Sequence, residues 1–418
     1  MMKGIFMLIA LAGTTFSYAQ QATIVVSNPT NAQRTELVEI NMSEVKAKFN
    51  NATPQKGEAY LVKNKQGQQI GSQLTHDGKL LIDASVRPNS SATYYICIGK
   101  PYPQKVWTTG ALYKIRKDDI AWENDRCAYR VYGPALQHTG ERSFGTDIWV
   151  KNTPDTIVYD RYIKDMNGNI LGDKIDAKVK TAKNEAKRKE LQVQSHEVDI
   201  TTSFHLDHGN GLDPYRVGAT LGLGAPGLMV GKDMVLPYCY KDYKILDNGP
   251  LRFTVELVYN PSTVDDMQNV VEHRIISLDK GSNFNKMTVW YEGLTHPTDF
   301  VTGFPIHEED TETKTFAKDY VSYADPTDNP EINQSQVYVG VLFPNGIDNT
   351  YYLLFDQKHD GATGHALGTK NGLKDGEKYS YYFGAAWSKY DVRSYGEWQL
   401  RIKEYLDAVK TPLTIELK

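Results

Sequence analysis

Short runs of alternating apolar and polar residues, separated by turn residues, dominate the chain from about residue 21 onward. A two-residue period places apolar side chains on one face of a strand. Polar segments at 63–67 and 76–79 predict turns between the first runs. The strands expected here are Ala22–Val26, Glu36–Ile40, Ala59–Val62 and Ser91–Ile98. Their number and spacing predict an immunoglobulin-like β-sandwich over residues 20–104, and the prolines of 101–103 mark its end.

Residues 105–418 carry longer alternating runs and are expected to form one large antiparallel β-sandwich. Strands are predicted at Phe253–Tyr259, His273–Leu278 and Asn285–Tyr291, and Asp279–Ser282 predicts a hairpin between the last two. Helix is expected at two places only. Lys180–Leu191 is rich in Ala, Lys and Glu, which favours an exposed helix or a mobile insertion. Apolar residues at three-to-four spacing predict another at Tyr395–Val409, before a final strand at Leu413–Leu417. The fold class is therefore predicted to be all-β.

The first residues predict export. A basic start at Met1–Lys3 precedes an apolar run over Gly4–Thr15, and Ser17-Tyr18-Ala19 then places small residues where a signal peptidase cuts. This pattern indicates a signal peptide over residues 1–19 and a mature protein in the periplasm or outside the cell. The apolar run is too short for a permanent membrane span, and no later segment resembles one.

Composition narrows the partners further. The formal net charge of −4 provides no basic face of the kind that nucleic-acid binding requires. The chain has 27 tyrosines and 6 tryptophans, which suit half-buried strand positions and sugar-binding surfaces alike. The three cysteines have no metal-like spacing and allow one disulfide at most, so no disulfide framework is expected.

One polar segment, residues 205–218, interrupts the apolar pattern. It holds two histidines, two aspartates, a tyrosine and an arginine, with glycines between them. The apolar runs beside it, Ile200–Phe204 and Val217–Leu223, predict strands. Binding and catalytic residues concentrate on polar loops that a rigid sheet positions. The alternative is that the Asp and His side chains only satisfy the backbone of the loop itself.

Three segments resemble the signatures of a family of secreted bacterial proteins that is classed as a domain of unknown function. They are Asp118–Leu136, Asp207–Gly211 with Tyr215 and residues 217–222, and Tyr382–Ser388. Such proteins occur in polysaccharide-degradation systems of gut and marine bacteria, and one member type is an ulvan oligosaccharide dehydratase. The resemblance implies a large antiparallel sandwich similar to galactose mutarotases. It also implies a lyase that removes water from a terminal uronate of an oligosaccharide and leaves an unsaturated sugar.

That reaction makes three demands on the residues. Elimination across C4 and C5 of a uronate needs a base for the C5 proton, an acid for the leaving hydroxyl and a cation for the carboxylate. We predict that His208 and Tyr215 transfer protons, with His307 as a third catalytic candidate. The substrate contacts are expected from Arg216, Arg274, His273, Trp290 and Trp387. The remaining histidines in polar segments are expected at surface turns: His76, His138, His296, His359 and His365.

A metal site is a further interpretation of the same loop. Two carboxylates and an imidazole can bind a divalent cation, and Asp207, His208 and Asp213 are the candidate ligands. Their spacing matches no specific metal-binding loop.

Two other functions remain open from the sequence. A glycoside hydrolase needs two carboxylates that face a sugar, and Glu308, Glu309 and Asp310 could supply one. A carbohydrate-binding protein without catalysis would instead present an aromatic platform, for which the candidates are Trp290, Tyr291, Trp387 and Tyr390.

Overall fold

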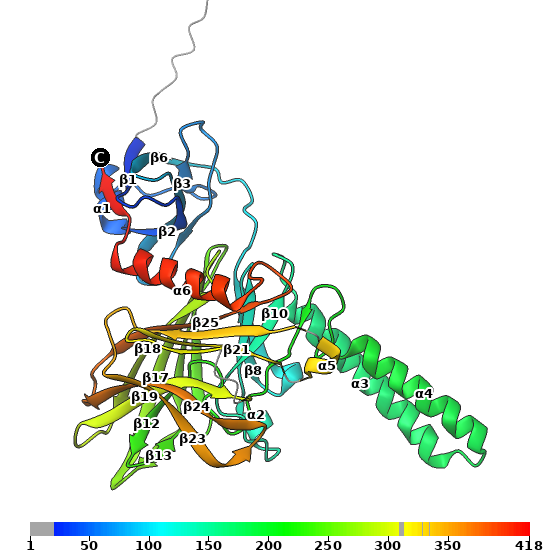
Figure 1. Cartoon of the computed structure of the whole chain (residues 1–418). Helices are drawn as coiled ribbons and strands as arrows, with labels where there is room; N and C mark the ends of the chain where they lie inside the picture. The colour runs from blue at the N-terminus through cyan, green and yellow to red at the C-terminus, as the bar shows by residue number, and fades with distance from the viewer. Residues whose placement is uncertain (1–20, 309–312, 328, 334) are drawn as a thin grey trace, which may run out of the picture.

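The computed structural model describes residues 21–308, 313–327, 329–333 and 335–418. A small two-sheet sandwich lies beside a larger part of three sheets, from which a long helical hairpin projects (Figure 1). The strand ladders of the described residues are antiparallel. The predicted all-β fold class is therefore confirmed. The predicted signal peptide lies outside the described residues. Among the described residues, no helix is both long and apolar enough to cross a membrane.

The small sandwich packs a sheet of order β26-β1-β6-β3 against a sheet of order β2-β5-β4. Its first sheet contains β1 (Gln21–Asn28), β3 (Ala59–Lys63), β6 (Ser90–Gly99) and β26 (Thr414–Leu417). Its second contains β2 (Arg34–Asn41), β4 (Ser72–Leu74) and β5 (Lys79–Val86), with the short helix α1 (Met42–Lys48) after β2. The alternating apolar residues face each other and are buried, among them Ile24, Val26, Ile40, Val62, Ile82 and Ile96.

The last strand of the chain belongs to this small sandwich, not to the large one with which the sequence grouped it. β26 pairs with β1, so that Ile24 lies opposite Leu417. Helix α6 (Tyr395–Lys410) carries the chain back between the two parts (Figure 1). Its predicted amphipathic pattern is confirmed, because Trp398, Ile402 and Leu406 are buried. The Ser394 hydroxyl caps its first turn by accepting a hydrogen bond from the Glu397 amide.

The large part consists of three sheets. The first, of order β11-β10-β9-β8-β7, contains β7 (Thr109–Tyr113), β8 (Asp119–Glu123), β9 (Cys127–Val131), β10 (Thr146–Lys151) and β11 (Gly211–Leu212). The second, of order β13-β12-β19-β24-β23, contains β12 (Pro226–Val230), β13 (Asp233–Val235), β19 (Thr298–Ile306), β23 (Asn349–His359) and β24 (Ala362–Leu373). Short helical turns η1 (Lys114–Arg116), α2 (Pro134–Gln137) and α5 (Pro330–Asn333) lie between strands.

The third sheet has the order β14-β15-β17-β18-β25-β22-β21-β20, with β16 paired to β17. Its strands are β14 (Tyr240–Asn248), β15 (Arg252–Tyr259), β16 (Ser262–Val264), β17 (Met267–Asp279), β18 (Phe284–Glu292), β20 (Lys314–Phe316), β21 (Tyr320–Asp325), β22 (Val337–Leu342) and β25 (Tyr379–Trp387). The predicted hairpin at 279–282 joins β17 to β18.

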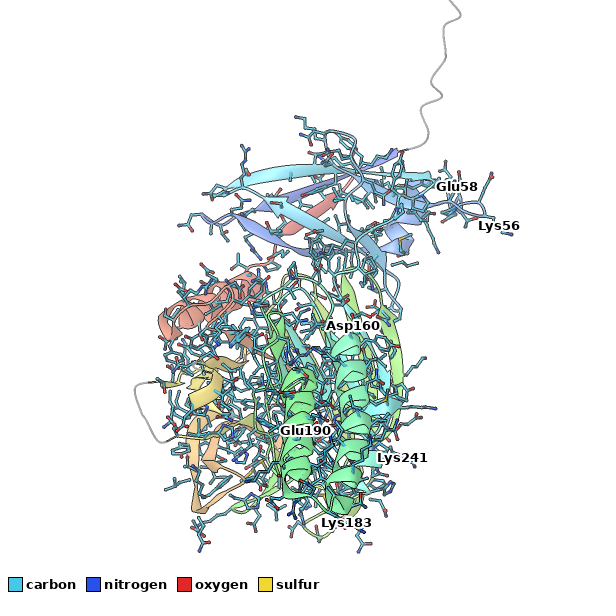
Figure 2. The ribbon with its side chains drawn as sticks, turned by 90° about the vertical axis from the view of Figure 1, so that its right-hand side faces the viewer. Lys56, Glu58, Asp160, Lys183, Glu190 and Lys241 are labelled. Carbon is cyan, nitrogen blue, oxygen red and sulfur yellow. The ribbon has the colours of Figure 1, made fainter. Side chains whose placement is uncertain are left out.

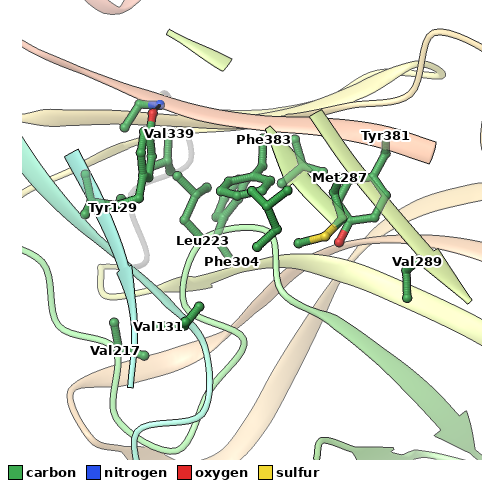
Figure 3. Close-up of a cluster of buried hydrophobic side chains, with 14 of the residues drawn as sticks. Tyr129, Val131, Val217, Leu223, Met287, Val289, Phe304, Val339, Tyr381 and Phe383 are labelled. Atoms are coloured by element: carbon green, nitrogen blue, oxygen red, sulfur yellow. Dashed lines mark hydrogen bonds between the residues drawn. The ribbon is translucent and has the colours of Figure 1, made fainter. Parts of the chain in front are cut away.

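Apolar side chains from all three sheets of the large part meet in one core. Figure 3 shows Tyr129 of β9, Phe304 of β19 and Phe383 of β25 within this cluster. Each of these side chains is almost fully buried. Burial of this much apolar surface holds the sheets together.

The helical hairpin is the largest departure from the sequence-based prediction. Instead of one helix at 180–191, the structure has α3 (Val158–Thr181) and α4 (Glu185–Thr202), which form the projecting hairpin and lie toward the viewer in Figure 2. The predicted strand at 200–204 is wrong. The hydroxyls of Thr201 and Thr202 donate to the carbonyls of Glu197 and Val198 and so remain within the last helical turn.

The strand predicted at 217–223 is also wrong. Gly218 and Gly222 adopt positive φ angles of 55° and 53°, which break an extended chain. The apolar residues of this segment, Val217, Leu221 and Leu223, are nevertheless buried under the sheets. A buried irregular loop therefore produced the apolar signal that the sequence analysis assigned to a strand.

We expect the contact of His76 with Asp247 to hold the two parts together. His76 lies in the β4–β5 turn, and its Nδ1 atom lies 2.8 Å from Oδ2 of the buried Asp247. His76→Ala should lower the free energy of unfolding by about 1 kcal/mol, since one hydrogen bond to a charged group is lost at a partly exposed site. Urea denaturation measures this value. His196→Ala, an exposed position on α4, is the control, and equal losses in both variants would contradict a joining role for His76.

Candidate active site

A buried histidine–aspartate pair stands at one end of the large part. His307 follows the last residue of β19, and Asp325 is the last residue of β21. The His307 Nδ1 atom lies 2.6 Å from the Asp325 Oδ2 atom, and the two side chains are 11% and 0% exposed. The Asp325 carboxylate also accepts a hydrogen bond from the Thr327 amide. With Nδ1 donating to Asp325, the lone pair of His307 is on Nε2. That atom is buried and bonds to no side chain of the described residues, while a backbone contact with Arg216 favours the protonated imidazole.

Tyr215 packs edge-on against this histidine. The ring centroids of Tyr215 and His307 are 5.7 Å apart, and the ring planes are inclined by 79°. The Tyr215 hydroxyl is buried and, within the described part of the chain, forms no hydrogen bond. Burial, together with the nearby Asp325 carboxylate, raises its pKa well above the usual value for tyrosine. Two polar groups suited to proton transfer therefore lie in neighbouring rings, and no side chain of the described residues bonds to either, which is costly unless a ligand uses them.

The neighbouring charges set the protonation of the pair. Burial disfavours the imidazolium form of His307, but the Asp325 carboxylate outweighs burial and raises the pKa of His307 above its ordinary value. The Arg216 side chain acts in the opposite direction. The Asp325 carboxylate therefore makes His307 hold a proton more readily than an ordinary histidine does.

A second histidine beside this pair was missed by the sequence analysis. His365 was expected at a surface turn, but it lies within β24, opposite Pro305, and is 2% exposed. The glycine-rich sequence before it suggested a turn. In the structure, Gly364 instead allows the carbonyl of Leu353 on β23 to approach closely. Burial and the nearby His307 lower the pKa of His365 to about 3, so this imidazole remains neutral.

A pocket of about 150 Å³ opens beside His307. Its lining consists of Arg216, His307, Glu308, Pro326, Thr327, Pro330, Lys358 and Gly361. Arg216 and Lys358 are exposed and bring two positive charges to this small space. The Arg216 side chain lies against Gly361, where a Cβ atom would come within 2.8 Å of its Nη1. The pocket is therefore suited to an anionic group next to the proton-transferring side chains.

Three of the predicted site residues, Tyr215, Arg216 and His307, are thus brought together. His208 is not. It lies exposed on the loop, where its Nε2 atom is 2.9 Å from the Ser203 carbonyl oxygen, and partial burial lowers its pKa. The positive φ angles of Gly209 and Gly211, 91° and 119°, turn the chain between His208 and the buried Tyr215.

The predicted metal site does not form. The Asp207 carboxylate accepts hydrogen bonds from the amides of Gly209 and Gly211, so it satisfies the loop's own backbone. Asp213 is buried and accepts a hydrogen bond from Arg130 at 2.7 Å. Within the described ranges, three possible metal-ligand atoms come within 4.8 Å of one another only in Asp265, Asp266 and His296. These three residues are exposed and lie outside the 205–218 segment.

Arg274 was predicted to hold the substrate, and the structure contradicts this. It is 1% exposed, donates to Glu272 at 2.6 Å and lies over the Tyr259 ring. Adjacent strand residues face opposite sides. His273, next to Arg274, therefore points outward, where it stacks on Trp290 at 4.8 Å.

The structure does not bring the two predicted aromatic contacts, Trp290 and Trp387, to the pocket beside His307. Trp290 lies on β18, between β17 and β25. His273 of β17 stacks on its ring, and Lys378, the residue before β25, also lies over the ring, so that neighbours from both sides cover it. Trp387 is 1% exposed and donates to the Ser335 hydroxyl. Neither tryptophan lines the pocket beside His307.

A larger cavity, of about 860 Å³, lies elsewhere. It is bordered by β2, the β17–β18 hairpin and α6, at the junction of the two parts. No histidine is among its lining residues, and its charged side chains form pairs such as Arg34 with Glu36. The smaller pocket, which His307 lines, is therefore the candidate site.

We predict that the Asp325 carboxylate controls the protonation of His307. In the wild type, the pKa of His307 should lie above its usual value, and in Asp325→Asn it should fall below that value, because burial then dominates. NMR titration of the imidazole signals measures both. His365, neutral throughout, serves as the internal control. An unchanged His307 pKa in Asp325→Asn would contradict the pairing.

Comparisons with known proteins found a curated relative, solved structures and a matching family model. A curated relative, "Uncharacterized protein P7" of Formosa agariphila, is 24% identical over 353 residues, which cover 81% of this chain and 78% of the relative. A solved glycosyl hydrolase family 38 protein from Enterococcus faecalis matches 96% of this chain at 9% identity with a TM-score of 0.50. An alpha-mannosidase from Enterococcus faecalis V583 gives a TM-score of 0.46 at 10% identity. This chain spans about half the length of these two structures, at 47% and 46%. A family model described as "Domain of unknown function (DUF4861)" matches residues 26–415, and the chain belongs to that family.

Proposed function

We propose that this protein is a carbohydrate-active lyase, a dehydratase that removes water from a terminal uronate of polysaccharide-derived oligosaccharides such as those of ulvan. One observation carries the proposal. The rings of His307 and Tyr215 pack together, His307 lines a pocket with two cations, and among the described residues no side chain bonds to the His307 Nε2 atom or to the Tyr215 hydroxyl. We further propose that the protein acts in the periplasm or outside the cell, as its first residues suggest.

In this proposal Arg216 binds the uronate carboxylate, with Lys358 beside it. A guanidinium group can hold a carboxylate through two parallel hydrogen bonds. Neutralising the carboxylate makes the C5 proton more acidic, because the negative charge that develops on the carboxylate is stabilised. The pocket is smaller than ordinary ligand sites, which suits the end of a chain better than its interior.

His307 then acts as the base. Its Nδ1–H bond to Asp325 fixes the ring and leaves Nε2 to accept the C5 proton. The imidazolium that forms is stabilised by the same carboxylate. Since Nε2 is shielded in the absence of substrate, side chains around the pocket have to shift slightly when the sugar enters.

Tyr215 acts as the acid, because its raised pKa keeps the hydroxyl protonated at neutral pH. The electron pair of the C5–H bond forms the C4=C5 double bond, and the C4–O bond breaks. The leaving hydroxyl takes the Tyr215 proton and departs as water. The proton held by His307 then returns to the Tyr215 oxygen, directly or through solvent, so that the enzyme is regenerated.

Hydrolysis is less well supported by the same residues. A glycoside hydrolase needs two carboxylates that face the sugar. Glu308 lines the pocket, whereas Asp325 is engaged with His307, and Glu309 and Asp310 lie outside the described residues. Hydrolysis would add water and cleave the chain, and mass spectrometry distinguishes this from loss of one water.

We predict that His307 and Tyr215 are needed for turnover. With a uronate-terminated oligosaccharide, the wild type should give a product lighter by one water and absorbing in the ultraviolet. His307→Gln and Tyr215→Phe should each lower kcat by about 10²–10⁴-fold, the usual contribution of proton transfer by a positioned group. His208→Ala is the matched control and should keep wild-type kcat. Equal losses in His208→Ala and His307→Gln would contradict the assignment.

Arg216→Lys should act mainly on binding. A lysine keeps the positive charge but cannot form the two-pronged contact with a carboxylate. KM should therefore rise more than kcat falls, which steady-state kinetics on the same oligosaccharide measures. A fall in kcat with unchanged KM would argue against Arg216 as the carboxylate-binding residue.

A further inference from the structure

A second buried group of charged side chains lies behind the loop that supplies Tyr215. Arg130 of β9 is 4% exposed. Its Nε atom donates to Asp147 of β10 at 2.6 Å, and its Nη2 atom donates to Asp213 at 2.7 Å. Asp213 precedes Tyr215 by only two residues. One arginine therefore connects the rigid sheet with the segment that carries two of the proposed active-site residues.

Aromatic rings fix the direction of this arginine. Its guanidinium lies 4.9 Å from the ring centroid of Tyr132, 5.8 Å from that of Trp149 and 5.5 Å from that of Phe204. The Tyr132 hydroxyl also donates to Asp147. The guanidinium can therefore not swing away from either carboxylate, and only a forked side chain can reach both.

The charge in this group is unbalanced. Asp119 lies 3.5 Å from Arg130 as a third buried carboxylate, with Arg116 close enough to act on it, and His205 lies 3.7 Å from Asp213. Burial and the Asp147 carboxylate raise the pKa of Asp213 to about 6, although Arg130 favours its charged form. Burying such a group usually costs stability, and replacing it with apolar residues is often neutral or better. Its presence calls for a role other than stability.

The backbone between Asp213 and Tyr215 has little freedom. Leu212 of β11 pairs with Val150 of β10, and the Asp213 amide donates to the Phe204 carbonyl at 2.9 Å. Pro214 follows with a fixed φ angle. A displacement of the Asp213 carboxylate is therefore transmitted to the Tyr215 ring rather than absorbed by the chain.

We propose that Arg130 is a positioning residue, which holds the 213–216 segment through Asp213 and so sets Tyr215 against His307. Arg130 itself does not line the pocket. The catalytic consequence rests on the proposed function, whereas the geometric one does not, and two experiments separate them.

The first experiment requires no activity. The Tyr215 ring packs edge-on against His307, so it shifts the NMR signals of the imidazole through its ring current. Tyr215→Phe keeps the ring and should leave these signals near their wild-type positions, while Tyr215→Ala gives the values without a ring. Arg130→Lys should move them toward those of Tyr215→Ala. Asp213→Asn, which keeps the shape of the side chain, should do the same to a smaller extent and replaces Arg130→Lys if that variant does not fold.

The second experiment is a double-mutant cycle on the dehydration. Arg130→Lys should lower kcat at least 10-fold. KM should change little, because the exposed Arg216 side chain can still reach the substrate carboxylate when the substrate binds. Arg130→Lys combined with Tyr215→Phe should lose little beyond Tyr215→Phe alone, because the two residues act as one unit. If Arg130 only stabilised the fold, the loss of kcat in the double variant would equal the product of the losses in the two single variants.

Arg161→Lys is the matched control. Arg161 is also a buried arginine, and its guanidinium donates to the carbonyls of Ser203, Phe204 and Leu206 in the early part of the same loop. It should leave the His307 signals and kcat unchanged. Unmoved His307 signals in both Arg130→Lys and Asp213→Asn overturn the inference. Moved signals without dehydration in the wild type would support the positioning role and reject the proposed function.

Discussion

The burial of ionisable side chains between the sheets is the constraint on which the rest of the large part depends. A buried charge without a partner is too costly to persist, so each such group fixes the segment that supplies its partner. The Glu123 carboxylate forms an ion pair with the buried Lys151. It also accepts hydrogen bonds from the amides of Ile157 and Val158, which fixes the start of α3. Arg130 fixes the loop at Asp213, and Asp325 fixes His307 after β19. Apolar packing holds the sheets, and buried pairs attach the irregular segments to them.

This arrangement explains how a site of mixed chemistry can stay in order without substrate. His307 and Tyr215 come from different parts of the chain, and in the part that the structure describes no side chain bonds to the reactive atom of either. Each is nevertheless held from behind, His307 by Asp325 and Tyr215 by the segment that Arg130 anchors. The reactive groups can therefore remain pre-organised, which is the condition for efficient electrostatic and proton-transfer catalysis. In the proposed function, the two exposed cations beside them bind the carboxylate of the sugar.

The sequence predicted the regular parts well, because alternation depends on which face of a strand is buried. The hairpin of β17 and β18 and the helix α6 follow from such patterns. The residue types for the chemistry were also recognisable, and Tyr215, Arg216 and His307 do meet. Their arrangement was not predictable. Asp325 becomes the partner of His307 only through the order of the sheets. Alternation alone could not tell whether His273 or Arg274 faces the core.

The central claim is that His307 removes the C5 proton of a terminal uronate, and isotopic labelling tests it most directly. A uronate-terminated oligosaccharide with deuterium at C5 would be incubated with the wild-type protein, and the mass of the product would be measured by mass spectrometry. The account predicts a product that has lost the deuterium together with the hydroxyl, formed more slowly than from the unlabelled substrate. A product that retains deuterium, or two fragments that have gained water, would contradict it.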